Sequence, residues 1–183
     1  MNIQTLLSIV ADQREELLAN DNSELCPRPE ESQLDLKSNR AQVVIGVRRC
    51  GKSTLCEMFL MQRGIEFAYV NFDDDRMEEM KAGDLDRLLE ALYMTYGDFK
   101  YLFLDEIQNV KGWPLFVNRL LRQKIHLFIT GSNSKLLSKE LSTHLTGRNN
   151  KVELYPFSFS EYCTMKKIDT ASQSTKAKGL RKS

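Results

Sequence analysis

The sequence predicts an α/β fold in which helices flank a parallel β-sheet. Runs of strand length that are apolar at consecutive positions alternate along the chain with segments of helical periodicity. Continuous apolar runs are typical of strands buried on both faces, and strands separated by helices join through right-handed crossovers into a parallel sheet. The glycine-rich segment Gly46–Ser53 lies between the first apolar run and a helix-compatible stretch, which indicates a strand–loop–helix unit.

The composition is that of an ordinary globular protein. A length of 183 residues predicts one domain with room for a substantial core, and contents of 42% hydrophobic and 28% charged residues are typical of such domains. The net charge of +1 favours neither nucleic acid nor an anionic membrane as a partner. No secretory signal is visible, and no run approaches the ~18 apolar residues of a membrane span. We therefore expect a cytoplasmic protein with no membrane partner.

Residues 1–40 are expected to form a helix and a linker that precede the core. Apolar residues recur at helical spacing through residues 2–19, which predicts an amphipathic helix packed on the core. Residues 20–40 are polar and contain Pro27 and Pro29, which predicts a loop or linker.

Residues 41–165 are expected to hold the core. Strands are expected at 41–47, 66–72, 100–105, 125–130 and 151–154. Helices are expected over 52–62, around 85–92, from 113 onward and, as a short element, around 134–141. Gly64 and Gly97 are placed to end the first two helices, and Pro114 is placed to open the third.

The chain is expected to end in a polar, disordered tail over residues 166–183. This tail contains six basic residues and one acid, namely Lys166, Lys167, Lys176, Lys178, Arg181 and Lys182 against Asp169. A basic tail is able to contact nucleic acid, but the solvated-tail interpretation is favoured. Four cysteines without metal-ligand spacing are expected to be free thiols, namely Cys26, Cys50, Cys56 and Cys163.

Gly46–Ser53 matches the pattern G-x-x-x-x-G-K-[ST] of a phosphate-binding P-loop. Its glycines allow a tight bend that points successive N–H groups at phosphate oxygens, and the following helix adds its positive end. We expect Lys52 to reach the β- and γ-phosphates of ATP and the Ser53 hydroxyl to bind Mg²⁺. The residues expected to bind the nucleotide here are Gly46, Val47, Arg48, Arg49, Cys50, Gly51, Lys52, Ser53 and Thr54.

The apolar run 101–104 ends in the adjacent acids Asp105 and Glu106, a Walker B pattern with a second carboxylate. Asp105 is expected to hold Mg²⁺ together with Ser53. Glu106 is expected to orient or deprotonate the attacking water. An acid pair after a strand is often only a solvated turn, but its position after a P-loop favours the catalytic interpretation.

Two further segments carry polar candidates. At the end of the fourth expected strand, Thr130, Ser132 and Asn133 are candidates for a sensor that contacts the γ-phosphate or the water, or for a helix cap. Arg148 is a candidate for stabilising the charge of phosphoryl transfer, from its own subunit or from a neighbour. A surface arginine is the alternative.

Charged residues near the P-loop have alternative roles. One of Arg48 and Arg49 is expected to contact phosphate or a neighbouring subunit, and the other to be solvated or paired with the acidic cluster Asp73–Asp75. That cluster is interpreted as a solvated loop rather than as a set of metal ligands. No Ser/His/Asp or Cys/His arrangement is evident.

Taken together and in order, these segments resemble the ATP-binding domain of the large prokaryotic AAA-domain ATPases related to archaeal-type and STAND-like P-loop proteins. The strings that carry the resemblance are GVRRCGKST, AYVNFDDDR, YLFLDEIQNVKGW, LFITGSNSKLLS, HLTGR and LYPFSFSEY, over roughly residues 40–163. The resemblance implies a P-loop NTPase fold with an ASCE-type sheet, in which an extra strand separates the P-loop strand from the Walker B strand. The implied strand order is 5-1-4-3-2.

The resemblance also implies roles for particular residues. Lys52, Ser53, Asp105 and Glu106 would carry the ATP and Mg²⁺ chemistry. Arg148 matches the Gly-Arg position of the group, and Ser132 lies in its sensor region. Members of the group are usually longer and continue into a C-terminal region that is often winged-helix or nuclease-like, so we expect this chain to lack that region.

The motifs predict an ATP-binding protein that hydrolyses ATP with Mg²⁺ through the catalytic residues Lys52, Glu106 and Arg148. The alternatives are a nucleotide-gated switch with little hydrolysis, a P-loop kinase, and a relic that no longer binds nucleotide. The partners expected are a second copy of the chain or a missing C-terminal domain, and nucleic acid is not supported by the net charge.

Overall fold

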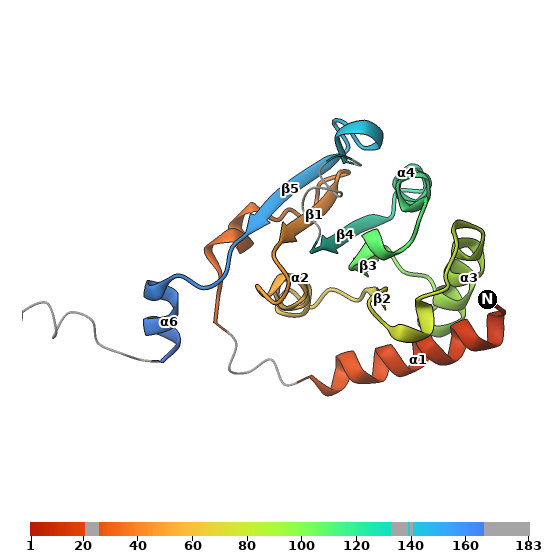
Figure 1. The fold of residues 1–183 in the computed structure, drawn as a ribbon, viewed down its shortest axis with the longest axis horizontal. Helices are drawn as coiled ribbons and strands as arrows, with labels where there is room; N and C mark the ends of the chain where they lie inside the picture. Colours follow the sequence, from red (N-terminus) through yellow and green to blue (C-terminus); the bar gives the residue numbers. More distant parts are fainter. Residues whose placement is uncertain (21–25, 133–138, 140, 167–183) are drawn as a thin grey trace, which may run out of the picture.

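A computed structural model of the chain describes residues 1–20, 26–132, 139 and 141–166. Within these ranges five parallel strands form one sheet, in the order β2-β3-β4-β1-β5 (Figure 1). The strands are β1 (Ala41–Gly46), β2 (Ala68–Asn71), β3 (Tyr101–Asp105), β4 (His126–Gly131) and β5 (Asn149–Leu154). The predicted α/β class is confirmed, and so is the order 5-1-4-3-2, which is the same order read from the other edge.

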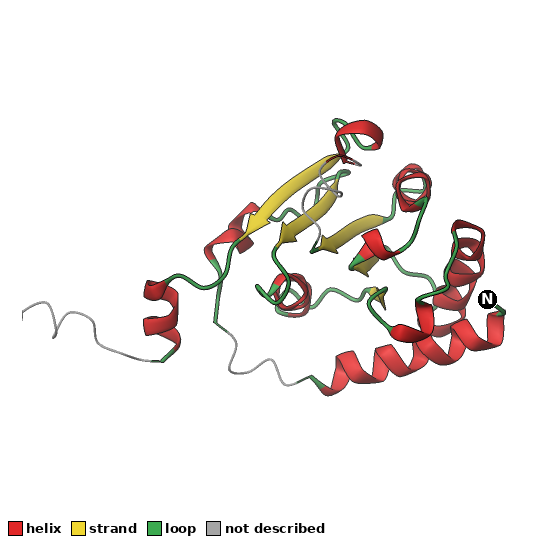
Figure 2. Cartoon of the chain, viewed as in Figure 1, coloured by secondary structure: helices red, strands yellow, loops and turns green. Residues whose placement is uncertain are grey.

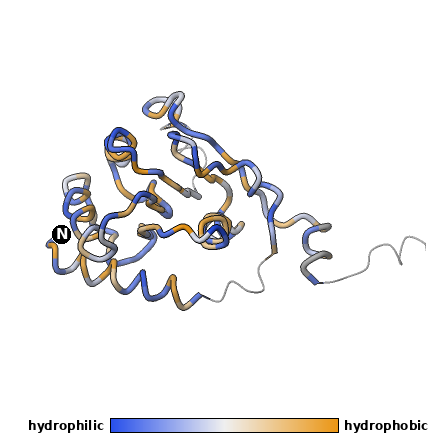
Figure 3. Tube along the Cα trace, turned by 180° about the vertical axis from the view of Figure 1, so that it is seen from behind, coloured by the Kyte–Doolittle hydropathy of each residue, from blue (hydrophilic) through white to orange (hydrophobic). Residues whose placement is uncertain are grey.

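Helices cover both faces of this sheet (Figure 2). The described helices are α1 (Ile3–Ala19), α2 (Lys52–Met61), α3 (Leu85–Tyr96), α4 (Trp113–Arg122) and the short α6 (Phe159–Met165). Strand residues alternate between the two faces, so Val43 and Ile45 pack with α1, α3 and α4 while Val44 packs with α2. In Figure 3 hydrophobic positions follow the strands, and the helices alternate hydrophobic and hydrophilic residues. The strands are continuous apolar runs because both faces are covered.

Most expected elements are present with small shifts in their ends. Gly97 ends α3 with a φ of 71°, and a proline lies in the first turn of α4. The short helix expected around 134–141 and the tail at 166–183 fall largely outside the described residues. The sequence pattern did not predict α6, because a helix of 7 residues is too short to show clear periodicity. None of the helices in the described ranges has the length and apolar character that a bilayer crossing requires.

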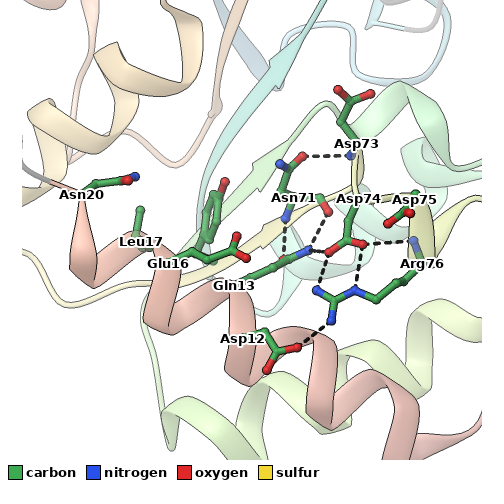
Figure 4. A pocket seen from close by; sticks show the side chains of 11 residues that line it. Asp12, Gln13, Glu16, Leu17, Asn20, Asn71, Asp73, Asp74, Asp75 and Arg76 are labelled. Carbon is green, nitrogen blue, oxygen red and sulfur yellow. Dashed lines mark hydrogen bonds and ion pairs between the residues drawn. The ribbon is translucent and has the colours of Figure 1, made fainter.

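Helix α1 packs on α3 and covers β2, the edge strand of the sheet. The buried side-chain amide of Gln13 donates to the Asn71 carbonyl over 3.0 Å and accepts from the Asn71 N–H over 2.9 Å. It also donates to Asp74, and Arg76 connects Asp74 to Asp12 (Figure 4). These contacts border a cavity of about 750 Å³ beside α1. Helix α1 therefore satisfies backbone groups that an edge strand would otherwise expose.

Two leucines of α1 test how much the packing of this helix contributes to the free energy of unfolding. Leu6 is 0% exposed and lies in the core with α3, whereas Leu18 is 71% exposed. Leu6→Ala is expected to lower the free energy of unfolding by about 2–5 kcal/mol, the range for deleting a buried leucine side chain. Leu18→Ala is expected to lower it by less than about 0.5 kcal/mol. Urea denaturation measures both losses, and equal losses would contradict the packing of α1.

Candidate nucleotide-binding site

The carboxyl ends of the described strands lie along one edge of the sheet, because neighbouring strands are parallel. A cavity of about 440 Å³ opens at this edge. It is lined by Arg48, Arg49, Gly51, Lys52, Ser53, Thr54, Asn71, Asp73, Asp105 and Glu106. Gly46, Val47 and Cys50 complete the loop without lining the cavity. The fold thus brings most of the expected P-loop and both Walker B acids together, at the edge where open α/β sheets bind ligands.

The P-loop turns sharply between β1 and α2 at positions with restricted geometry. Gly51 has a φ of 92° and Arg49 a φ of 64°, the left-handed region that favours glycine. A Cβ on Gly46 would lie 2.2 Å from the carbonyl oxygen of Leu154, which β5 places alongside it. The two glycines of the motif are therefore required by the backbone path and by the neighbouring strand, independently of any ligand.

Lys52 is one of three cations that line the cavity, together with Arg48 and Arg49. Its side chain is 3% exposed, and its Nζ donates to the Val47 carbonyl over 3.2 Å. The same Nζ lies 3.2 Å from Oε1 of Glu106, whose side chain is 14% exposed. Buried charges are stable only when they are paired, so this ion pair holds the P-loop lysine against the end of β3.

Asp105 ends β3 inside a cluster of hydroxyl groups. Ser53 Oγ donates to Asp105 Oδ1 over 2.8 Å, and Thr130 Oγ1 donates to the same oxygen. Tyr69 donates its hydroxyl to Oδ2 over 3.4 Å. Burial raises the pKa of Asp105, and the hydrogen bonds from Thr130 and Ser53 offset only part of that increase. A nearby cation would stabilise the ionised carboxylate at this position.

The oxygens of Ser53 and Asp105 fit a magnesium ion. Magnesium prefers oxygen ligands, and it is usually held by one or two carboxylates together with waters and substrate phosphates. Among the described residues, no group of three or more His, Cys, Asp or Glu side chains forms a candidate metal site. A cation at Ser53 and Asp105 would therefore need further ligands from a nucleotide and from water.

Glu106 follows β3 in a left-handed backbone conformation, with a φ of 52°. Its Oε1 pairs with Lys52, while its Oε2 accepts hydrogen bonds from Gln108 Nε2 over 2.6 Å and from the Ser132 N–H over 2.8 Å. Burial opposes ionisation, but these hydrogen bonds and the Lys52 charge outweigh it and lower the pKa of Glu106. Glu106 is therefore a carboxylate at neutral pH.

Two of the three sensor candidates contact the acids. Thr130 is fully buried, donates to Asp105 and accepts from the Glu106 N–H over 3.0 Å. Ser132 donates its N–H to Glu106, and Asn133 lies outside the described residues. The end of β4 thus fixes the positions of both acids.

Gln108 and Tyr69 also belong to this network, and neither is predicted from the sequence motifs. Gln108 lies in the 3₁₀ turn Ile107–Asn109 that directly follows the acids, and a side-chain amide two residues after Glu106 is the signal that could have indicated it. No local signal indicates Tyr69, because its contact with Asp105 depends on the pairing of β2 with β3.

Arg48 forms an ion pair with Asp73 over 2.7 Å, and both side chains are largely exposed. This arrangement agrees with the expectation that one P-loop arginine pairs with the acidic cluster. Cys50 is buried and points its Sγ at the Leu154 carbonyl, 3.5 Å away. Burial raises the pKa of the Cys50 thiol, which keeps it protonated.

Arg148 lies at the opposite end of the sheet. Its carbonyl accepts the N–H of Ala41, the first residue of β1, over 2.9 Å, and its guanidinium donates to Asn118. The P-loop begins at the far end of this six-residue strand, about 20 Å away at about 3.3 Å per residue. The expectation that Arg148 reaches a nucleotide in its own subunit is therefore wrong. A contact from a neighbouring subunit stays a prediction.

Known sequences share this combination of segments. The sequence profile of the AAA domain matches residues 38–163, more than half of the chain. The chain belongs to the AAA domain family. An uncharacterized protein of Methanocaldococcus jannaschii is 40% identical over 138 residues, which cover 75% of this chain and 31% of that protein. An uncharacterized protein of Haemophilus influenzae is 38% identical over 140 residues, which cover 72% of this chain and 35% of that protein. This AAA domain spans about a third of the length of these relatives.

Two solved structures show a weaker similarity to this chain. The structure of C. elegans PCH-2 has a TM-score of 0.44 and 16% identity, with 84% of this chain and 43% of that chain covered. The structure of Drosophila ORC bound to AT-rich DNA and Cdc6 has a TM-score of 0.43 and 9% identity, with 89% and 33% covered. At the level of the family, membership of the AAA domain group supports ATP binding and hydrolysis.

Glu57 gives this AAA domain a testable pH dependence. It lies one helical turn after Ser53, is 7% exposed, and has a pKa raised to about 7 by burial and then by the charge of Asp105. Between pH 4.5, the ordinary value, and pH 7 the folded protein keeps a proton that the unfolded chain releases. Stability is therefore lost as the pH rises through this window.

Glu57→Gln removes this titration. Relative to the wild type, its free energy of unfolding is expected to rise by roughly 2–3 kcal/mol between pH 5 and pH 8. Urea denaturation without nucleotide at both values measures the change. The exposed Glu90→Gln on α3 is the control and is expected to show no such trend. A relative stability of Glu57→Gln that is independent of pH would contradict the assignment.

Proposed function

We propose that this AAA domain binds ATP with Mg²⁺ in the 440 Å³ cavity and hydrolyses it. The observation that carries the proposal is the convergence of two contacts at one edge of the sheet. Lys52 pairs with Glu106, and Ser53 donates to Asp105. Each contact joins the P-loop to the Walker B strand, so a triphosphate held by the loop would lie against both acids.

Lys52 and the loop N–H groups are proposed to bind the phosphates. In this structure Lys52 is held by the Glu106 carboxylate and by the Val47 carbonyl. Both are oxygen acceptors, which phosphate oxygens would replace without leaving the buried ammonium unpaired. Ser53 and Asp105 would hold Mg²⁺, which supplies charge neutralisation at the β- and γ-phosphates when bound.

Glu106 is proposed to orient the attacking water. Its Oε2 is fixed by Gln108 and Ser132, whereas its Oε1 is paired with Lys52. When Lys52 turns to the phosphates, Oε1 is left to accept a hydrogen bond from water. The lowered pKa makes Glu106 a weak base, so orientation of the water is its main contribution and proton removal is secondary.

The same lowered pKa favours the second candidate function, a nucleotide-gated switch with little hydrolysis. The P-loop kinase alternative is less well supported, because such kinases place the P-loop and Walker B strands side by side. Here β4 lies between β1 and β3. The relic alternative is disfavoured by the placement of Lys52 and Ser53 in the cavity.

The partners of the whole protein are part of the same proposal. Because the chain covers only about a third of its relatives, a C-terminal region or a second copy is proposed to complete the working assembly. Arg148 is exposed at the end of the sheet opposite the cavity. In a homo-oligomer it would be free to approach the nucleotide of the next subunit.

Lys52→Ala and Glu106→Gln test the proposed roles. Lys52→Ala is expected to weaken Mg-ATP binding by at least about tenfold, because hydrogen bonds to a charged group are lost. Glu106→Gln is expected to keep binding and to lower the turnover number by about 100-fold or more. Calorimetric titration and phosphate release measure the two quantities.

The matched control for the first variant is Lys100→Ala, which removes an exposed lysine at the opposite end of β3 and is expected to bind as the wild type does. Wild-type affinity in Lys52→Ala would contradict the P-loop assignment. Tight binding with no turnover in the wild type would favour the switch over the ATPase.

A further inference from the structure

Arg28 is a buried cation that the proposed chemistry does not use. In the sequence it lies between α1 and β1, directly before the 3₁₀ turn Pro29–Gln33. Its exposed fraction is 7%. Its guanidinium donates from Nη1 to the Cys50 carbonyl over 3.3 Å and from Nη2 to the Tyr155 carbonyl over 2.6 Å. One side chain thus connects the middle of the P-loop with the residue that follows β5.

The same guanidinium contacts the segment that leads out of the sheet. Its Nε lies 3.0 Å from Oε1 of Glu161 in α6, and 3.6 Å from Oε2 of Glu30. The Phe157 ring lies 4.5 Å from the guanidinium carbon. A planar guanidinium presents its donors in fixed directions, so Nη1 and Nη2 fix the two carbonyls, while Nε contacts Glu161 as an ion pair without a hydrogen bond. Arg28 therefore holds the P-loop and residues 155–161 in one defined relation.

The direction of the Cys50 carbonyl determines the direction of the next N–H group in the P-loop. In a trans peptide the C=O of one residue and the N–H of the next point in opposite directions. Cys50 does not line the cavity, whereas Gly51 does. Holding the Cys50 carbonyl toward Arg28 therefore fixes the direction of the Gly51 N–H, one of the donors expected to meet phosphate. The flexibility of glycine makes such a restraint effective, because Gly51 itself imposes little preference.

We propose that Arg28 is a positioning residue for phosphate binding, and that through it the segment 155–161 sets the nucleotide affinity of the P-loop. The proposal rests on the proposed function, since it presupposes that the cavity binds a nucleotide. Displacement of Glu161 or Phe157 by a further part of the protein would loosen Arg28 and weaken binding. Binding of nucleotide would in turn favour the arrangement of 155–161 seen here, because such coupling is reciprocal.

Arg63 provides a matched control. It also joins the linker to the core, by an ion pair with Glu31 over 2.8 Å and a hydrogen bond to the Phe59 carbonyl over 3.0 Å. It also lies over an aromatic ring, that of Phe59, at 3.9 Å. It does not contact the P-loop. Arg63→Met therefore removes a similar tie without touching the phosphate site.

The experiment measures Mg-ATP affinity by calorimetry, and stability without nucleotide by urea denaturation, at a temperature where every variant is folded. Arg28→Met is expected to weaken Mg-ATP binding by at least about tenfold, as for loss of a charged hydrogen bond. Arg63→Met is expected to stay within about twofold of the wild type even if its stability falls, since surface ties contribute little. Arg28→Lys keeps the positive charge but lacks the planar set of donors of a guanidinium, and it is expected to give an intermediate affinity for Mg-ATP.

Glu161→Gln retains the Arg28 side chain but removes the carboxylate charge paired with its Nε, and it is the second test. It is expected to weaken Mg-ATP binding several-fold in the wild-type background and to have no effect in Arg28→Met, because its influence passes through that arginine. Wild-type affinity for Mg-ATP in a folded Arg28→Met protein would overturn the proposal. If Arg28→Met does not fold, wild-type affinity in Glu161→Gln would overturn it. Absence of binding in the wild type, or unchanged binding in Lys52→Ala, would instead overturn the proposed function.

Discussion

The buried ion pair between Lys52 and Glu106 is the contact on which the rest of the candidate site depends. Its two side chains are 3% and 14% exposed, so both charges have lost most of their hydration. Such a pair contributes little net stability compared with apolar side chains of similar volume, and leaving either partner alone would be costly. The role of the pair is therefore to hold two charged groups in a buried position where each is able to exchange its partner for a ligand. A phosphate would satisfy Lys52, and a water would satisfy the released carboxylate oxygen.

The order of the strands explains how the acids are held. Strand β4 lies between the P-loop strand and the Walker B strand, and the register places Thr130 opposite Val44 of β1. Thr130 therefore lies between the P-loop strand and the acids. Its hydroxyl donates to Asp105 and accepts from the Glu106 N–H. Side-by-side placement of β1 and β3 would leave no strand to supply this bridge. The topology thus provides part of the chemistry of the site.

The sequence predicts those features that depend on local geometry. The P-loop positions, the acids after β3 and the helix ends at Gly97 and Pro114 need only a few neighbouring residues, and the structure places them as expected. The order of the strands is not a local property, and it came from the resemblance to a family. The prediction for Arg148 rested on the Gly-Arg motif and did not use its position directly before β5, which in a parallel sheet lies at the edge opposite the ligand.

Arg28 was not recognisable from the sequence because its contacts depend on how distant segments pack together. Its two backbone acceptors lie 22 and 127 residues away along the chain. Gln108 and Tyr69 likewise acquire their contacts from the way the turn after β3 and the edge strand are packed. Side chains that position others through long-range contacts carry no pattern of their own, whereas side chains that meet a ligand are placed in motifs.

A structure of this AAA domain with a non-hydrolysable ATP analogue and Mg²⁺ tests the central claim most directly. We predict the triphosphate in the 440 Å³ cavity, with Lys52 Nζ turned from Glu106 to a phosphate oxygen and Ser53 Oγ beside the metal. A nucleotide bound with the Lys52–Glu106 pair intact would contradict this prediction. So would a nucleotide bound in the cavity beside α1.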